Sequence, residues 1–150
     1  MQDLNLPSFK LTLLKKEGKT LVFDELRKKY VILTPEEWVR QHFIRFLIEL
    51  KNYPGGLMSI EKVLKVNGIS FRTDTVVYTR NGHPKMLIEF KAPSVEVDQS
   101  TLFQIAKYNK KLDVPYLVLS NGMKHYCFKA NEKGVFRPME NIPNYSELES

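Results

Sequence analysis

The sequence predicts an α/β protein with a central mixed β-sheet flanked by helices and a β-rich extension at its N-terminus. Three short runs with strand-like alternation occupy the first 33 residues. Helical and strand-like patterns alternate after them, and residues 84–120 read as strand, helix and strand. Such a β-α-β unit has parallel strands and a right-handed crossover. The length of 150 residues suits a single domain over residues 1–150, with its core at about residues 34–129.

The composition is that of a soluble globular protein, with 43% hydrophobic and 27% charged residues. No apolar run is long enough to cross a membrane, and the first twenty residues show no signal-peptide pattern. The single cysteine, Cys127, excludes an internal disulfide framework. We therefore expect a cytoplasmic protein without a membrane partner. The net charge of +6 favours a polyanionic partner, although a merely basic surface would give the same value.

The N-terminal extension is predicted to contain strands at residues 9–13, 20–24 and 29–33. A helix then begins after Thr34, which is a typical N-cap followed by Pro35 at the first helical position. It runs to about residue 52, before Pro54-Gly55-Gly56. Glu37 falls where a capping box needs a carboxylate, so it either caps its own helix or serves a functional site. A second, shorter helix is predicted over residues 57–66, with Gly68 as its stop.

A β-hairpin is predicted over residues 70–93. Asn81-Gly82 lies between two runs rich in β-formers, and this pair is favoured in two-residue type I′ turns, which need positive φ at both positions. In that register Asp74 lies opposite Glu89, and strand alternation places Arg72 and Lys91 on the same face.

Two carboxylates that face each other across a hairpin repel, and burial increases that cost. A divalent cation between Asp74 and Glu89 would remove the conflict, and oxygen ligands suit Mg²⁺ or Mn²⁺. Lys91 would point toward that cation and its bound water. The alternative is an ordinary exposed ion pair between Glu89 and Lys91. The apolar sequence around the two residues favours burial.

After the hairpin, a helix is predicted over residues 100–112, with Gln104 and Tyr108 one turn apart on one face. Strands follow at residues 114–120 and 124–129. The remaining tail is predicted to be irregular and then frayed.

The order of these elements resembles the restriction-endonuclease-like core of the PD-(D/E)xK nuclease superfamily. Within it, the sequence is most similar to the N-terminal nuclease domain of type I restriction enzyme R subunits. The matching pieces are T-P-E-E-W-V-R-Q at 34–41, R-T-D at 72–74, I-E-F-K-A-P at 88–93, Q-I-A-K-Y at 104–108 and S-N-G at 120–122. Thr73 takes the place of the superfamily's proline. No Walker-type phosphate loop occurs in the 150 residues, so we interpret the chain as a stand-alone relative or an excised domain.

The resemblance implies a metal site and a set of residues around it. Asp74 and Glu89, with the backbone carbonyl of Phe90, would hold Mg²⁺ (or Mn²⁺), and Glu37 would lie near the metal, directly or through water. Lys91 would position or help deprotonate the attacking water. The resemblance implies that Gln104 and Tyr108 orient Lys91 or contact the DNA backbone. The residues that we expect to contact phosphates are Lys62, Lys65, Arg72, Arg80, Lys107, Lys110 and Lys111.

The sequence thus favours a metal-dependent DNA endonuclease domain similar to that of type I restriction R subunits. Its expected partners are DNA and either a motor or specificity subunit or a second copy of the chain. A catalytically silent nucleic-acid-binding or interaction module with the same fold is the main alternative. A small-molecule or RNA hydrolase on this core is a weaker one.

Overall fold

The computed structural model describes residues 1–149. It describes the side chains of all of these except Leu64, Val66, Phe71, Tyr108 and Lys111. The predicted roles of Tyr108 and Lys111 therefore lie outside the described side chains.

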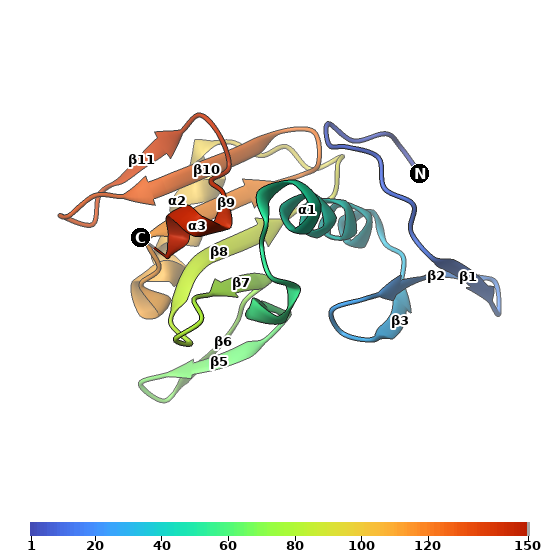
Figure 1. The fold of residues 1–150 in the computed structure, drawn as a ribbon, viewed down its shortest axis with the longest axis horizontal. Helices are drawn as coiled ribbons and strands as arrows, with labels where there is room; N and C mark the ends of the chain where they lie inside the picture. Colours follow the sequence, from blue (N-terminus) through green and yellow to red (C-terminus); the bar gives the residue numbers. More distant parts are fainter. Residues whose placement is uncertain (150) are drawn as a thin grey trace.

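A six-stranded mixed sheet forms the centre of the molecule, as predicted (Figure 1). Its strand order is β11-β10-β9-β8-β7-β4. The pair β8–β9 is parallel and the other pairs are antiparallel, so the β-α-β unit is confirmed. The strands are β4 (Met58–Ile60), β7 (Thr75–Tyr78), β8 (Pro84–Phe90), β9 (Tyr116–Ser120), β10 (His125–Ala130) and β11 (Phe136–Met139).

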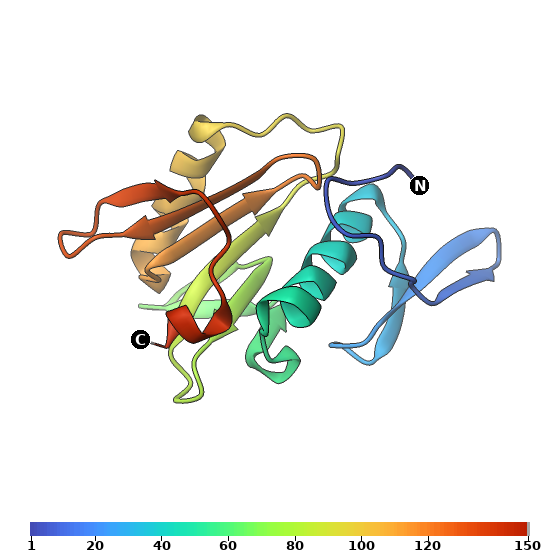
Figure 2. The ribbon, with the colours of Figure 1, turned by 45° about the horizontal axis from the view of Figure 1, so that its top comes forward.

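Helices α1 (Pro35–Lys51) and α2 (Gln99–Leu112) cover the two faces of this sheet (Figures 1 and 2). Successive strand residues point to opposite faces, so alternate residues of one strand enter different cores. Ile88 and Phe90 of β8 pack with α1 residues such as Phe43. Leu87 packs with Leu102 of α2. Residues that follow Leu87 in steps of two, Glu89 and Lys91, therefore belong to the α2 face.

The helix after Thr34 forms as predicted. The Thr34 hydroxyl accepts a hydrogen bond from the backbone N–H of Glu37, and Pro35 occupies the first turn. The helix ends at Asn52, which adopts the left-handed conformation and donates its N–H to the Leu47 carbonyl.

The N-terminal extension is a separate three-stranded sheet of β1 (Leu13–Lys16), β2 (Lys19–Asp24) and β3 (Lys29–Ile32). The first strand lies later than the predicted residues 9–13. The turn decides its position, because Glu17 and Gly18 both have positive φ and join the paired residues Lys16 and Lys19.

The predicted helix over residues 57–66 is wrong. The segment forms a short 3₁₀ turn (Gly55–Leu57), then β4, and then β5 (Val63–Val66), which pairs with β6 (Ile69–Arg72). Asn67 and Gly68 both have positive φ, so the dipeptide read as a helix stop is the two-residue turn of a hairpin. The spacing of Ile60, Val63 and Leu64 imitates a helix, but β-branched residues and the Asn-Gly turn favour strands.

The hairpin predicted over residues 70–93 is interrupted, and its turn differs from the prediction. Strand β6 ends at Arg72 and belongs to the β5–β6 pair, so only β7 and β8 form the predicted ladder. The pairs Thr75–Ile88, Val76–Leu87 and Val77–Met86 follow the predicted register. Within the turn only Gly82 has positive φ, so the turn is not the predicted type I′. The Thr79 N–H donates to the His83 carbonyl, which makes the loop one residue longer. A β-bulge next to Tyr78 then returns the two strands to the predicted register.

The C-terminal tail is more ordered than predicted. It contributes β11 to the central sheet and ends in α3 (Tyr145–Leu148). Tyr145 and Leu148 are both buried, and the Tyr145 hydroxyl donates to the Tyr78 carbonyl at 2.9 Å. The frayed end predicted from polar composition is therefore wrong, because two apolar side chains anchor it.

Candidate active site

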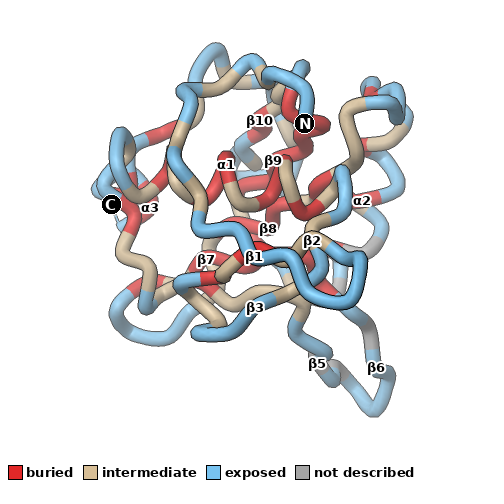
Figure 3. Tube along the Cα trace, turned by 90° about the vertical axis from the view of Figure 1, so that its right-hand side faces the viewer, coloured by how far each residue is buried: buried red, intermediate tan, exposed pale blue. Residues whose placement is uncertain are grey.

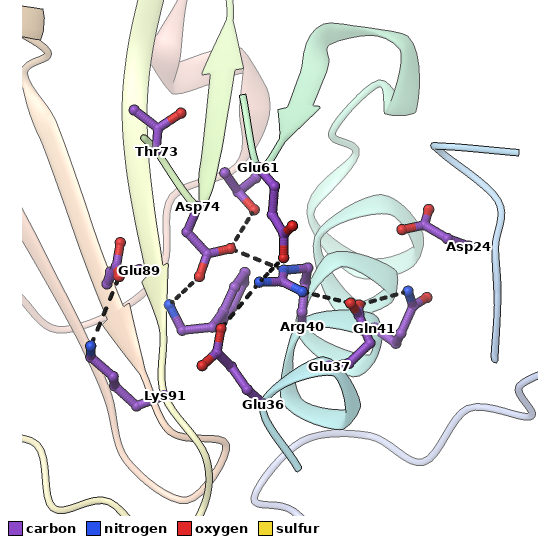
Figure 4. A network of polar contacts seen from close by, with 12 residues as sticks. Asp24, Glu36, Glu37, Arg40, Gln41, Glu61, Thr73, Asp74, Glu89 and Lys91 are labelled. Carbon is purple, nitrogen blue, oxygen red and sulfur yellow. Dashed lines mark hydrogen bonds and ion pairs between the residues drawn. The ribbon is translucent and has the colours of Figure 1, made fainter. Parts of the chain in front are cut away.

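Asp74 lies in the link between β6 and β7, at the end of the central sheet (Figure 4). Its side chain is buried, and both carboxylate oxygens accept strong hydrogen bonds. Arg40 Nε donates to Oδ1 at 2.9 Å, and the backbone N–H of Phe90 donates to Oδ2 at 3.1 Å. Strand β7 begins at Thr75, so the Asp74 side chain provides the partner that the buried Phe90 N–H needs. Burial raises the pKa of Asp74, and the bonds from Arg40 and Phe90 only partly oppose this rise.

Arg40 of α1 is the centre of a buried network of charges. Its guanidinium contacts Asp74, Glu37 at 2.7 Å, Glu36 at 3.3 Å and Glu61 at 3.3 Å. Only 3% of its side chain is exposed, so these carboxylates replace the water that the cation has lost. Burial by itself would lower the pKa of Arg40, but Asp74, Glu37 and Glu61 together raise it.

Glu89 and Lys91 lie on the other side of β8 from Arg40. The Lys91 ammonium is 4.0 Å from Glu89 Oε1, which makes a loose, partly exposed ion pair. Burial raises the pKa of Glu89 to about 7, and the negative charges of Asp74 and Glu36 add to the effect. Lys91 and Arg40 oppose this rise without cancelling it. Glu89 is therefore a carboxylate that lacks a full counter-charge, which is how a site for a proton or a cation behaves.

Two adjoining cavities contain these groups. A cavity of about 490 Å³ is lined by Glu89 and Lys91 of the β8 end, by Gln104 of α2 and by Arg72 of β6. A second cavity of about 300 Å³ contains Asp74 and Glu89 together, and its full lining is Glu36, Arg40, Glu61, Arg72, Thr73, Asp74 and Glu89. The structure thus brings Asp74, Glu89, Lys91, Gln104 and Arg72 to one region of the surface.

Glu37 neither accepts a capping bond nor lines this region. Its carboxylate accepts hydrogen bonds from Arg27 at 2.9 Å, Arg40 at 2.7 Å and Gln41 at 3.0 Å. It reaches Asp74 only through Arg40. The preceding residue, Glu36, faces the cavity instead, and burial and Asp74 raise its pKa.

Sequence reasoning missed Glu36, Arg40 and Glu61 as members of the site. Glu36 and Arg40 stand one turn apart on α1, a spacing that could have indicated an ion pair. No sequence pattern indicates the contact of Glu61 with Arg40, because the sequence predicts a helix for the segment that contains Glu61.

Among the predicted phosphate contacts with described side chains, Arg72 lines both cavities, whereas Lys62, Lys65, Arg80, Lys107 and Lys110 line neither. Arg80 lies in the turn at the opposite end of β7 and β8, where it pairs with Glu149 and stacks over the Tyr145 ring at 5.4 Å. Lys107 is exposed on α2 and lines neither cavity.

The donor set fits a hard divalent cation in chemistry, since it offers carboxylate oxygens from Asp74 and Glu89. Among residues 1–149, however, no three histidine, cysteine, aspartate or glutamate side chains stand close enough together to hold a metal ion. Asp74 is turned toward Arg40 and Phe90. Of the two expected metal ligands, Asp74 pairs closely with Arg40 at 2.9 Å and Glu89 pairs loosely with Lys91 at 4.0 Å.

The Ser120-Asn121-Gly122 motif has a structural task beside the site. Asn121 accepts bonds from the N–H groups of Met123 and Lys124 and donates to the Val95 carbonyl at 2.8 Å. Asn121 thereby stabilises the β9–β10 turn and connects it to the loop that follows Lys91. None of the helices in the described chain is long and apolar enough to cross a membrane.

Comparisons with known proteins agree with this architecture. The model of a family described as the type I restriction enzyme R protein N terminus (HSDR_N) matches residues 35–143. A solved fragment of a protein assigned as the HsdR subunit of a type I restriction enzyme from Vibrio vulnificus YJ016 has a similar fold, with a TM-score of 0.57 and 19% identity. The similarity covers 77% of this chain and 24% of that one, so this chain corresponds to about a quarter of it. No curated protein matches the chain. Since the family model spans most of its length, this chain belongs to the family of type I restriction enzyme R protein N termini.

Proposed function

We propose that this chain is a nuclease domain that hydrolyses phosphodiester bonds of DNA with the help of Mg²⁺ or Mn²⁺. The observation that carries the proposal is the placement of Asp74, Glu89 and Lys91 around two adjoining cavities at one end of the sheet. The pKa of Glu89 is raised to about 7, so this carboxylate gains from a nearby cation. Membership of the R-protein family supports the same reading.

Asp74 and Glu89, together with the backbone carbonyl of Phe90, would hold the metal. A bound divalent cation lowers the pKa of a coordinated water and neutralises charge on the phosphate oxygens. Lys91 supplies a fixed positive charge beside the reacting phosphate, which stabilises the negative charge of the transition state. Gln104 lines the same cavity as Lys91 and can orient its ammonium through the amide oxygen.

Arg40 holds the Asp74 carboxylate in place, and Glu36 lies across the smaller cavity. Glu37 would act on the site through Arg40, by fixing the guanidinium that contacts Asp74. This differs from the predicted role of Glu37 beside the metal.

Cleavage of supercoiled plasmid DNA in Mg²⁺ or Mn²⁺ tests the proposal. We expect Glu89→Gln and Lys91→Met each to reduce the rate by about 100-fold or more, because each removes a group that acts on the reacting phosphate. Lys133→Gln, in the exposed β10–β11 turn, is the matched control and should cleave normally. Undiminished cleavage by both site variants would refute the assignment.

A catalytically silent DNA-binding module is the second candidate, and the Arg40–Asp74 ion pair favours it. In that case Arg40 neutralises the charge of Asp74, and no metal is needed to do so. Calorimetry with Mn²⁺ separates the two functions, because a silent module shows no binding that depends on Asp74 and Glu89. A motor subunit, a specificity subunit or a second copy of the chain are the partners that we propose for the longer assembly.

A further inference from the structure

The β5–β6 hairpin projects from the body of the molecule (Figures 1 and 3). It is a two-stranded sheet of its own and belongs to neither of the larger sheets. The two-residue turn at Asn67-Gly68 makes its tip narrow, since Val66 and Ile69 pair directly on either side. Two of its apolar side chains, Val63 and Ile69, are exposed to solvent.

The hairpin carries positive charge without any acidic residue of its own. Residues 62–72 contain Lys62, Lys65 and Arg72, and neither aspartate nor glutamate. The register pairs Lys65 with Ser70 and Val63 with Arg72, so Lys65, Ser70 and Arg72 share one face. Lys65 and Arg72 are exposed, and 67% of the Arg72 side chain is open to solvent.

That face is the wall of the proposed active site. Ser70 and Arg72 line the 490 Å³ cavity together with Glu89 and Lys91. Thr101 and Gln104 of α2 line the same cavity. The cavity is therefore a cleft between the hairpin and α2, with the β8 end between them.

The root of the hairpin is bonded directly to Asp74. The N–H of Glu61 donates to the Asp74 carbonyl at 2.6 Å, and Thr73 donates from both its N–H and its hydroxyl to the Lys62 carbonyl at 3.0 Å. Arg72 pairs with Glu61 at 2.5 Å, but 67% of the Arg72 side chain is exposed, so the pair contributes little to stability. A phosphate can take the place of Glu61 as the partner of Arg72.

We infer that the β5–β6 hairpin is an arm that grips the sugar-phosphate backbone of duplex DNA and guides one strand into the cleft beside Glu89 and Lys91. The inference rests on the proposed nuclease function, and it names the substrate as duplex DNA. A two-stranded ribbon has the width that the major groove admits, and cationic side chains on its face meet the phosphates at the groove edge. Such contacts position the DNA without reading its sequence.

The test is binding of a fluorescently labelled duplex in the presence of a chelator, where no cleavage can occur. The variant Lys65→Gln with Arg72→Gln removes the two charges of the arm. The control Lys16→Gln with Lys19→Gln removes two charges beside the turn of the β1–β2 hairpin. We expect the arm variant to lose about tenfold or more in affinity, with the slope of log K against log salt reduced by about 1.8, which is 0.9 for each of two phosphates. The control should bind like the wild-type protein.

A tethered probe locates the DNA independently of affinity. Cys127 is buried, so Ser70→Cys places the sole accessible thiol of the described chain in the cleft. An iron chelate attached there should cut a duplex, and should cut single-stranded DNA of the same length much less.

Each outcome has a distinct meaning. Unchanged affinity and salt slope in the arm variant, or equal cutting of single-stranded DNA by the tethered chelate, would overturn the arm. A duplex that binds through the arm but is never cleaved in Mg²⁺ or Mn²⁺ would overturn the nuclease function and leave the arm standing. A wild-type protein that binds no duplex would overturn both.

Discussion

Arg40 Nε donates a hydrogen bond to Asp74 Oδ1 at 2.9 Å, and both side chains are buried. The other oxygen of Asp74 is occupied by the Phe90 N–H. A guanidinium thus supplies positive charge to the carboxylate that we propose as a metal ligand. Metal binding at Asp74 would therefore compete with the Arg40 ion pair for the same negative charge.

Replacement of Arg40 by glutamine is expected to destabilise the protein by about 3–5 kcal/mol, because Asp74 stays buried without its counter-charge. Urea unfolding in a chelator measures this cost. Arg45→Gln is the control on the same helix, since Arg45 pairs with Glu25 at the surface. Its expected cost is below about 1 kcal/mol, and a similar loss in both variants would contradict the central role of Arg40.

Mn²⁺ is expected to raise the thermal midpoint of Arg40→Gln more than that of the wild-type protein. In the variant Asp74 has no competing cation, and a ligand stabilises the native state more when it binds that state more tightly. Differential scanning fluorimetry with and without Mn²⁺ gives the two shifts. Asp74→Asn is the reference for loss of the ligand and should show almost no shift. An equal shift in all three proteins would mean that Mn²⁺ binds elsewhere.

Glu89→Gln is expected to stabilise the metal-free protein more at pH 8 than at pH 5. The folded pKa of Glu89 is about 7 and its ordinary value is 4.5, so between these values the native state holds a proton that the unfolded state has released. The stability of the wild-type protein therefore falls as the pH rises through this window. Glutamine removes that dependence, so the difference in melting temperature between variant and wild type should grow with pH. Glu132→Gln, in an exposed turn, controls for the loss of one carboxylate, and a constant difference would show that the pKa is not raised.

Two glycines with the same backbone conformation are expected to differ in their tolerance of alanine. Gly82 has φ of 82° and Gly122 has φ of 84°. No atom lies within 4 Å of a Cβ placed on Gly82, so Gly82→Ala should cost only the backbone strain, about 1 kcal/mol. A Cβ on Gly122 would meet Leu4 at 2.7 Å and Val39 at 3.1 Å, which adds about 1–3 kcal/mol. Unfolding of both variants in urea measures the difference, and equal costs would contradict the packing of the N-terminal segment against this turn.

The main helices could be predicted because their signals are local. The parallel strand pair could be predicted from the order strand, helix, strand along the chain. Thr34-Pro35 marks the start of α1, and the apolar stripe of α2 is complete within fourteen residues. The segment before β7 could not be predicted in the same way. Its Ile60, Val63 and Leu64 spacing suits a helix, and the decision for two strands came from the turn at Asn67-Gly68 and from pairing across it. At the Asn81-Gly82 turn the strand register was predicted correctly but the loop was not. The loop has one more residue than predicted, and the β-bulge next to Tyr78 accommodates it.

The sequence by itself determined which groups carry charge near the end of β8: Asp74 just before β7, Glu89 near the end of β8, and Lys91 just after it. It also determined that alternation would place Glu89 and Lys91 on the same face of the sheet. The tertiary structure alone decided which charges meet. Packing of α1 against the sheet turned Glu36 toward the cavity, Glu37 toward Arg27 and Arg40 toward Asp74. The physical reason is that side-chain direction along a strand follows from its local period, whereas contacts between charges of separate elements depend on how those elements pack.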